Sequence, residues 1–238
     1  MTSPANFSTP DTIIRSAMIE AKLLQTGDDP SSENYAEYMP RLNHLINTWQ
    51  TDGLRLWLNF DQSVTLVAGT AKYSFSPTGA VVMTRPLRVI DGYYLDSSSN
   101  RRPLWSMGRL DYDKLSNVTN QGAVNSYFVD KQQTTLDVYF WMTPDTTAAT
   151  GTAHVILQQQ VTNFTGLTDT MNFPVEWYLS LIWGLADEIC GGQPQAIMNR
   201  CAQRAAFYKE KLDNWDVEDA STVFTPDQRQ TWGTGRFI

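Results

Sequence analysis

Apolar and polar positions form their clearest pattern in residues 172–215, where they predict two helices that fold back on each other. The first is expected to begin at Pro174 and to end at Gly191 and Gly192, because proline fits the first turn of a helix and glycine favours its end. It is apolar around most of its circumference, and one face carries Trp177, Leu181, Leu185 and Ile189. Such a helix is buried on several sides, so it is predicted to be central.

The second helix of this pair is expected to begin at Pro194 and to cover the first. Its single apolar stripe consists of Ile197, Cys201, Ala205, Tyr208, Leu212 and Trp215. Arg200, Arg204 and Lys211 are among the polar residues that the helical period turns away from this stripe.

Two more helices are predicted within residues 8–52. Thr9 and Pro10 suit an N-cap and a first helical position, and Gly27 is expected to end the first of these helices. The next helix is expected to bend at Pro40, and His44 falls on its polar face. Its apolar face consists of Tyr35, Tyr38, Met39, Leu42, Leu45, Ile46 and Trp49.

From Gly53 onward the apolar period shortens to about 2 residues, which indicates strands. Residues 63–68 and 71–76 flank Gly69 and Thr70 and are predicted to form a hairpin, and residues 126–130 and 136–142 a second one. The other elements expected are an edge or bent strand over 81–95, a turn over 96–100, a short strand over 103–106, a short helix over 110–115 and a last strand over 153–161.

Strands grouped between helices predict an α+β fold. Residues 8–52 and 172–215 are expected to form a helical bundle from the N- and C-terminal helix pairs. Residues 53–171 are expected to form an inserted antiparallel β-rich domain, and residues 216–238 an extended C-terminal arm.

The charge balance argues against a protein that grips nucleic acid. The 238 residues include 18 Lys and Arg and 25 Asp and Glu, a formal charge of −7, and the longest basic cluster is Arg101-Arg102. Tight DNA binding through phosphates needs a basic footprint. Aromatic residues make up 12% of the chain and include 8 Trp, which favours large contact surfaces.

The cysteines and the apolar runs bear on the compartment. If the helix pair turns near Gly192, Cys190 and Cys201 lie about 10 Å apart along the axis, and a disulfide needs Cα atoms within about 7 Å. Both are therefore predicted to be free, buried thiols, which is typical of a reducing compartment. Met1 begins no recognisable secretory signal, and the longest apolar run, residues 177–186, is shorter than a membrane span of about 20 residues.

The sequence shows no catalytic motif, and no catalytic residue, metal or cofactor is predicted. Phosphate loops, dinucleotide-binding glycines and zinc-ligand spacings are absent. His44 and His154 are interpreted as structural, since nothing in the sequence brings either of them to a nucleophile. The acidic pairs Asp111 with Asp113 and Asp187 with Glu188 are interpreted as the start of a short helix and the solvated end of a long one.

The last residues of the chain are too apolar for an ordinary solvated tail. The arm is predicted to dock on a partner, or alternatively to fold back on its own domain or fray. The partner-binding candidates are Phe224, Arg229, Trp232, Arg236, Phe237 and Ile238, with the two arginines as polar anchors. Tyr and Trp on the helix pairs are expected to be core in a monomer or subunit contacts in a ring.

Five segments of the chain carry a family resemblance. They are Leu45-Ile46-Asn47-Thr48-Trp49, Leu56-Trp57-Leu58-Asn59-Phe60, residues 64–75, Pro103-Leu104-Trp105 with Asp111-Tyr112-Asp113 after it, and Phe173-Pro174-Val175-Glu176-Trp177. In these segments the chain resembles the head-to-tail adaptors of short-tailed bacteriophages, a family that includes tail tubular protein A and the packaged-DNA stabilisation proteins. The resemblance covers most of residues 8–215. It does not extend residue by residue into the arm.

The resemblance implies a virion protein of the tail or neck that is assembled in the host cytoplasm. It implies a homo-oligomer, a dodecameric ring that joins the portal protein to the tail nozzle protein and continues or seals the DNA channel. DNA would pass the lumen without sequence-specific binding, and an acidic lumen would repel its phosphates. No membrane partner is implied.

Two alternatives remain open. A β-rich glycan- or receptor-binding virion module would use Trp57, Trp105 and Trp141 to stack on sugars. A hydrolase acting through Asp111 or Asp113 is the third hypothesis.

Overall fold

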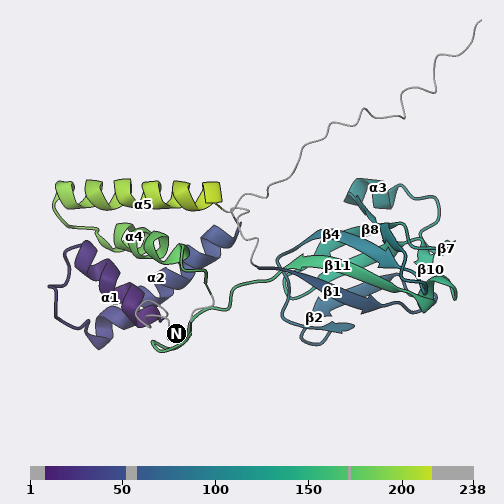
Figure 1. The fold of residues 1–238 in the computed structure, drawn as a ribbon, viewed down its shortest axis with the longest axis horizontal. Helices are drawn as coiled ribbons and strands as arrows, with labels where there is room; N and C mark the ends of the chain where they lie inside the picture. The colour runs from purple at the N-terminus through teal and green to yellow at the C-terminus, as the bar shows by residue number, and fades with distance from the viewer. Residues whose placement is uncertain (1–8, 52–57, 171–172, 216–238) are drawn as a thin grey trace, which may run out of the picture.

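The structure is a computed structural model that describes residues 9–51, 58–170 and 173–215, and within these ranges it has an α+β fold (Figure 1). The helices are α1 (Pro10–Glu20), α2 (Ser32–Thr51), α3 (Arg109–Asp113), α4 (Trp177–Ile189) and α5 (Gln195–Trp215). The strands are β1 (Asn59–Thr65), β2 (Lys72–Ser76), β3 (Val81–Val82), β4 (Arg88–Leu95), β5 (Arg101–Pro103), β6 (Trp105–Met107), β7 (Gln121–Gly122), β8 (Ser126–Lys131), β9 (Leu136–Trp141), β10 (Thr143–Pro144) and β11 (Thr152–Gln158).

The four longer helices, α1, α2, α4 and α5, share one hydrophobic core. Helix α4 contacts the other three, and its predicted face of Trp177, Leu181, Leu185 and Ile189 is buried. The central position expected for this helix is therefore confirmed. One apolar side chain of the helix, Leu179, lies outside this cover and is 52% exposed.

Two helix boundaries differ from the prediction. Helix α1 ends at Glu20, because Lys22 adopts a positive φ of 60°, and Gly27 lies in the connection that follows. Helix α4 begins at Trp177 rather than at Pro174, so Glu176 is its N-cap residue and not part of its first turn. The glycine end is confirmed, since Gly192 has a φ of +86° just after α4.

The strands form two larger sheets that share a second hydrophobic core. The four-stranded sheet has the order β1-β11-β4-β5 and is antiparallel throughout. The five-stranded sheet has the order β3-β2-β9-β8-β6 and is mixed, because β3 and β6 pair in parallel with their neighbours. The predicted hairpin of β8 and β9 is confirmed, with Leu136, Val138 and Phe140 fully buried.

The hairpin predicted around Gly69 and Thr70 is wrong. Strand β1 pairs with β11 in one sheet, whereas β2 pairs with β9 and β3 in the other. The turn carries the chain across the core instead, and the Gly69 N–H donates to the carbonyl of Pro144. Val64 of β1 and Tyr73 of β2 can thus reach the same core from its two sides.

Similar crossings divide two other predicted strands. Residues 81–95 form β3 at the edge of the five-stranded sheet and β4 inside the four-stranded sheet. Residues 101–107 form β5 and β6, which belong to different sheets and are separated by the buried Leu104. A period of two residues tells which side chains face a core but not which of two sheets a strand joins.

The segment that leaves β11 runs along α2 before α4 begins. The amide of Asn43 exchanges two hydrogen bonds with the backbone of Phe164, each of 2.9 Å. The side chain of Gln50 accepts a third, also of 2.9 Å, from the N–H of Val161. These bonds tie the connection between the strands and α4 to the helices.

Candidate interaction surface

One side of α5 carries a row of basic and aromatic side chains, here called the α5 stripe. It consists of Arg200, Arg204, Phe207, Lys211 and Trp215, at steps of four, three, four and four residues, the spacing of a single helix face. All five are exposed, Phe207 to 44% and Trp215 to 55%. The apolar stripe that was predicted to face the core, here called the core stripe, lies directly beside it. Helix α5 therefore has one buried face and one cationic, aromatic face. Trp215, predicted to belong to the core stripe, lies on the exposed side.

Helix α4 continues this surface. Trp183 stacks on Tyr208 of α5 with ring centroids 6.5 Å apart, and the guanidinium of Arg200 lies 5.4 Å from the Trp183 ring. Leu179, one turn before Trp183 on the same side of α4, is exposed. Two helices therefore contribute apolar side chains to one surface.

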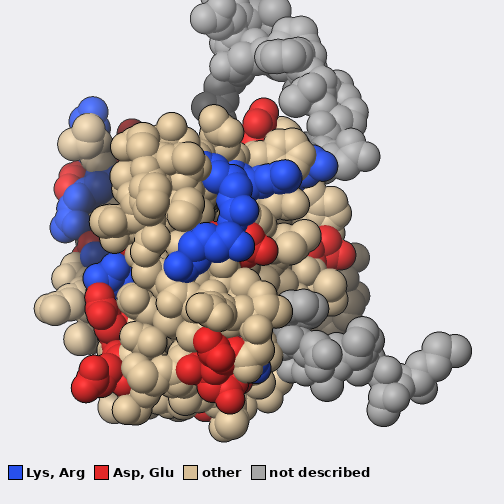
Figure 2. All heavy atoms as spheres, turned by 90° about the vertical axis from the view of Figure 1, so that its left-hand side faces the viewer, with Lys and Arg blue, Asp and Glu red and all other residues tan. Residues whose placement is uncertain are grey.

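The cations of the stripe differ in how they are held. Arg200 is tied to α1, since its Nη2 lies 3.0 Å from the Glu20 carboxylate and 2.6 Å from the Glu20 carbonyl. The Lys211 ammonium lies 4.6 Å from the Phe207 ring. Neither Arg204 nor Lys211 has an ion pair within the described part of the chain. Figure 2 shows Lys and Arg gathered across the upper half of this end of the molecule.

The thiols beneath the helix pair are free and buried, as predicted. Burial, with the nearby Cys190 as a further cause, raises the pKa of Cys201 to about 11. The Cys190 thiol itself donates to the carbonyl of Asp187 at 3.1 Å.

A second group of interacting side chains lies on the outer face of the four-stranded sheet. Nδ1 of His154 is 2.9 Å from Oδ1 of Asp61, and the Tyr93 hydroxyl donates to Oδ2 of the same carboxylate. The Tyr93 ring stacks on His154 at 4.7 Å, and the Arg101 guanidinium lies 3.7 Å from the Tyr93 ring. Although burial alone would raise the pKa of Asp61, hydrogen bonds from Tyr93 and His154 hold that pKa below its usual value.

This cluster has part of a catalytic arrangement but not the whole. A carboxylate on Nδ1 orients the imidazole and leaves Nε2 for other partners. Ser63 lies opposite His154 in the strand register, yet no hydrogen bond joins its hydroxyl to the ring in the described residues. The sequence did not predict which residues surround His154, because the pairing of β1 with β11 is a long-range contact. The only sequence signal for this cluster was the presence of polar residues at alternate positions of the two strands.

The structure places the other candidate residues on three different helices. Asp111 and Asp113 are exposed on α3, and His44 is exposed on α2. Asp187 and Glu188 are exposed near the end of α4, as expected. The arm candidates Phe224, Arg229, Trp232, Arg236, Phe237 and Ile238 lie outside the described residues.

Of the three tryptophans proposed for sugar stacking, two come together. Ser126 pairs with Trp105 on one side and with Trp141 on the other, so the three residues form a row across the five-stranded sheet. Trp105 is 70% exposed at the edge of the sheet. The indole N–H of Trp141 donates to the carbonyl of Asn117 at 3.3 Å. Trp57 lies outside the described residues.

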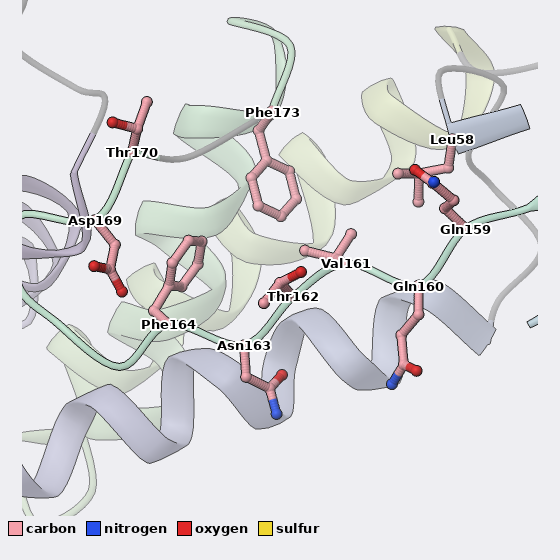
Figure 3. Close-up of a pocket in the computed structure, with 10 residues that line it drawn as sticks. All are labelled: Leu58, Gln159, Gln160, Val161, Thr162, Asn163, Phe164, Asp169, Thr170 and Phe173. Carbon is pink, nitrogen blue, oxygen red and sulfur yellow. The ribbon is translucent and has the colours of Figure 1, made fainter. Parts of the chain in front are cut away.

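A pocket of about 420 Å³ lies beside the segment that follows β11 (Figure 3). The rings of Phe164 and Phe173 point toward each other there, with centroids 6.3 Å apart. The carboxylate of Asp169 accepts hydrogen bonds from the backbone N–H groups of Thr165 and Gly166, so it is already engaged. One oxygen of this carboxylate, Oδ2, is therefore held by backbone groups four and three residues before it.

Residues 9–51, 58–170 and 173–215 hold no group of three or more His, Cys, Asp or Glu side chains arranged for a metal ion. No helix in these ranges is long and apolar enough to cross a membrane. A comparison of the chain with models of known protein families gives no match, and a comparison with curated proteins gives none either.

Proposed function

We propose that this chain is a structural virion protein, a head-to-tail adaptor that forms a ring between the portal protein and the tail nozzle protein and continues or seals the DNA channel. In this proposal the helices form a bundle made of the N- and C-terminal pairs, the strands form an insertion, and residues 216–238 reach a partner. The ring is dodecameric, lies in the neck of the virion and is assembled in the host cytoplasm.

The observation that carries the proposal is the exposed surface of the α4–α5 pair. Leu179, Phe207 and Trp215 are 52%, 44% and 55% exposed, and they are held on two helices whose other faces fill a core. Exposed large apolar side chains on a rigid helix pair are typical of protein interfaces, and aromatic and arginine side chains dominate the energetics of such interfaces. The resemblance to the adaptor family, which covers most of residues 8–215, supplies the identity of the partners.

The charge of the chain supports the same role. A formal charge of −7 disfavours adhesion to DNA phosphates, which a channel for a moving genome must avoid. The cations of the α5 stripe are therefore assigned to protein contacts rather than to DNA.

The test is assembly with the portal. The purified chain is imaged by negative stain at increasing concentration, alone and after mixing with purified portal rings. The proposal expects a ring or an added layer below the portal. A chain that stays monomeric and adds no layer at high concentration would contradict it.

A glycan- or receptor-binding virion module is the second candidate, and the row of Trp105, Ser126 and Trp141 favours it. Two indoles on one sheet face suit stacking on sugar rings, which present apolar faces. Titration with glycans would then shift tryptophan fluorescence, and Trp105→Ala would abolish the shift. An unchanged spectrum across a glycan panel would remove this candidate.

A further inference from the structure

The helical part of the chain has an acidic region, here called the acidic corner. It consists of Asp28, Asp29, Glu33 and Glu37, which lie between α1 and α2 and in the first half of α2. All four are exposed, and residues 23–40 contain no Lys or Arg. The basic residues that pair with this region, Arg15 and Arg41, come from outside this stretch of sequence.

Half of these carboxylates have no cation beside them. Asp29 lies 3.1 Å from Arg15, and Glu37 lies 2.6 Å from Arg41. Asp28 and Glu33 form no ion pair within the described residues. The α5 stripe has a matching surplus in its two unpaired cations.

The two surfaces lie on opposite sides of the helices. Figure 1 shows α5 along the upper edge and the connection from α1 to α2 at the lower left. In Figure 2 most basic side chains lie in the upper half, while Asp and Glu occur in both halves and form clusters near the lower edge. The distance between them keeps the surplus charges from meeting within one subunit.

Opposite faces of unlike character are what a closed ring requires. Each subunit in a ring uses two different patches, one for each neighbour, and the contact repeats around the axis. Complementary charges orient such a contact and exclude wrong pairings. The aromatic side chains of the stripe would supply the buried area.

We propose that the α5 stripe of one subunit binds the acidic corner of the next copy of this chain, with Arg204 and Lys211 facing Asp28 and Glu33. This inference rests on the proposed ring and specifies its subunit contact. The contact weakens with salt, because exposed charges are screened over about 10 Å at 0.1 M ionic strength and about 3 Å at 1 M.

The test is a charge exchange between the two faces. Arg204→Glu with Lys211→Glu gives the first variant, and Asp28→Lys with Glu33→Lys gives the second. Each is expected to raise the concentration needed for assembly by on the order of 10-fold or more, since each puts like charges opposite one another. All four substitutions in one chain are expected to restore assembly to within about threefold of wild type, because the signs are complementary again.

Matched controls and a milder pair of variants keep the result interpretable. Lys114→Glu with Lys131→Glu, and Asp111→Lys with Asp113→Lys, change the net charge equally at exposed sites on other elements. Both are expected to assemble like wild type. Arg204→Gln with Lys211→Gln removes the cations without adding acid and is expected to weaken assembly less than the reversal. Circular dichroism checks that every variant is folded.

The outcomes separate this inference from the proposed function. Rings that form normally in both reversed variants, or a four-substitution chain that stays as weak as either parent, would overturn the contact and leave the ring intact. A wild-type chain that forms no ring, alone or on the portal, would overturn the proposed function and this contact with it. Loss in each reversed variant with recovery in the combination supports the assignment.

Discussion

Replacing the aromatic residues of the α5 stripe should weaken assembly and leave the subunit folded. Phe207→Ala and Trp215→Ala remove side chains that are 44% and 55% exposed, so little of the core depends on them. Phe207 also loses its contact with the Lys211 ammonium, worth about 0.5 kcal/mol at an exposed site. The buried part of each side chain is about 100 Å², so at about 25 cal/mol per Å² the free energy of unfolding should fall by at most about 2.5 kcal/mol per substitution, a change in Tm of about 5–10 °C.

The expected loss of assembly follows from the exposed areas. An aromatic side chain buries about 150–250 Å², so Phe207 offers about 80 Å² and Trp215 about 130 Å² to a partner. At about 25 cal/mol per Å² these areas correspond to about 2 and 3 kcal/mol. Lost translational and rotational freedom and the ordering of side chains offset much of this free energy. The net contribution to association is then about 1.5 kcal/mol for each residue, or roughly 10-fold in affinity. The two residues are eight positions apart, about 12 Å along α5, so the double variant should lose on the order of 100-fold.

Sedimentation velocity over a concentration series measures this effect, with Leu110→Ala as the control. Leu110 is 73% exposed on α3, so its truncation removes a comparable exposed apolar side chain away from the helix pair. The control is expected to assemble like wild type. If the double variant assembles at the same concentration as wild type, the α5 stripe is not a subunit contact. If it loses its thermal transition, the side chains belong to the core and the exposure argument is wrong.

Three further predictions concern the two cores and the thiols. Lys72 lies 2.8 Å from the buried Asp137, so Lys72→Met should lower the free energy of unfolding by about 1–2 kcal/mol in urea titrations, at the low end because Lys72 is half-exposed. Burial would raise the pKa of Asp137, but the ion pair with Lys72 holds that pKa below its usual value. The loss in free energy of unfolding caused by Lys72→Met should therefore be complete above about pH 4, and it should vanish as the pH falls through the pKa of Asp137 in the folded chain. Leu181→Ala, fully buried in α4, should cost about 3 kcal/mol in the same assay, and a loss under 1 kcal/mol would contradict its central position. Because its pKa is raised to about 11 from an ordinary value of 9.0, Cys201 should react with iodoacetamide at pH 8 about 100-fold more slowly in the folded chain than in urea, and equal rates would refute this.

The sequence correctly predicted the elements in which apolar residues recur regularly over a long stretch. The buried face of α4 and the core stripe of α5 follow from steps of three and four residues, which leave one solution for the side that faces the core. The hairpin of β8 and β9 was equally readable, because a short connection joins two adjacent strands. In each case the information lies within about 20 residues of sequence.

Sheet membership could not be read in the same way. Strands β1 and β11 are neighbours in space but lie 93 positions apart between Asp61 and His154. Nothing local distinguishes a Gly-Thr turn that closes a hairpin from one that carries the chain across a core. The Asp61 and His154 contact depends on that pairing, so the sequence left His154 as an isolated histidine.

The α5 stripe was visible in the sequence only as the polar side of a helix. The same spacing that predicts the core predicts which residues face away from it, but it does not say whether that face meets water or a neighbour. Exposure decides this in part: Trp215 was expected in the core stripe and Leu179 lies on the helix predicted to be central, yet both side chains are more than half exposed. The excess of exposed apolar surface is what a periodicity argument cannot detect.

The central helix pair also explains how a subunit could keep two contact faces at a constant angle. Ring closure fails if the rotation between neighbours varies, so the patch on α5 and the patch between α1 and α2 must be parts of one rigid unit. Arg200 joins α5 to the end of α1 through Glu20, and α1, α2, α4 and α5 share one core. The acidic corner begins eight residues after Glu20, at Asp28. The residues that fill the core therefore also set the angle between the two surfaces, and a cavity in α4 should loosen the assembly geometry as well as the fold.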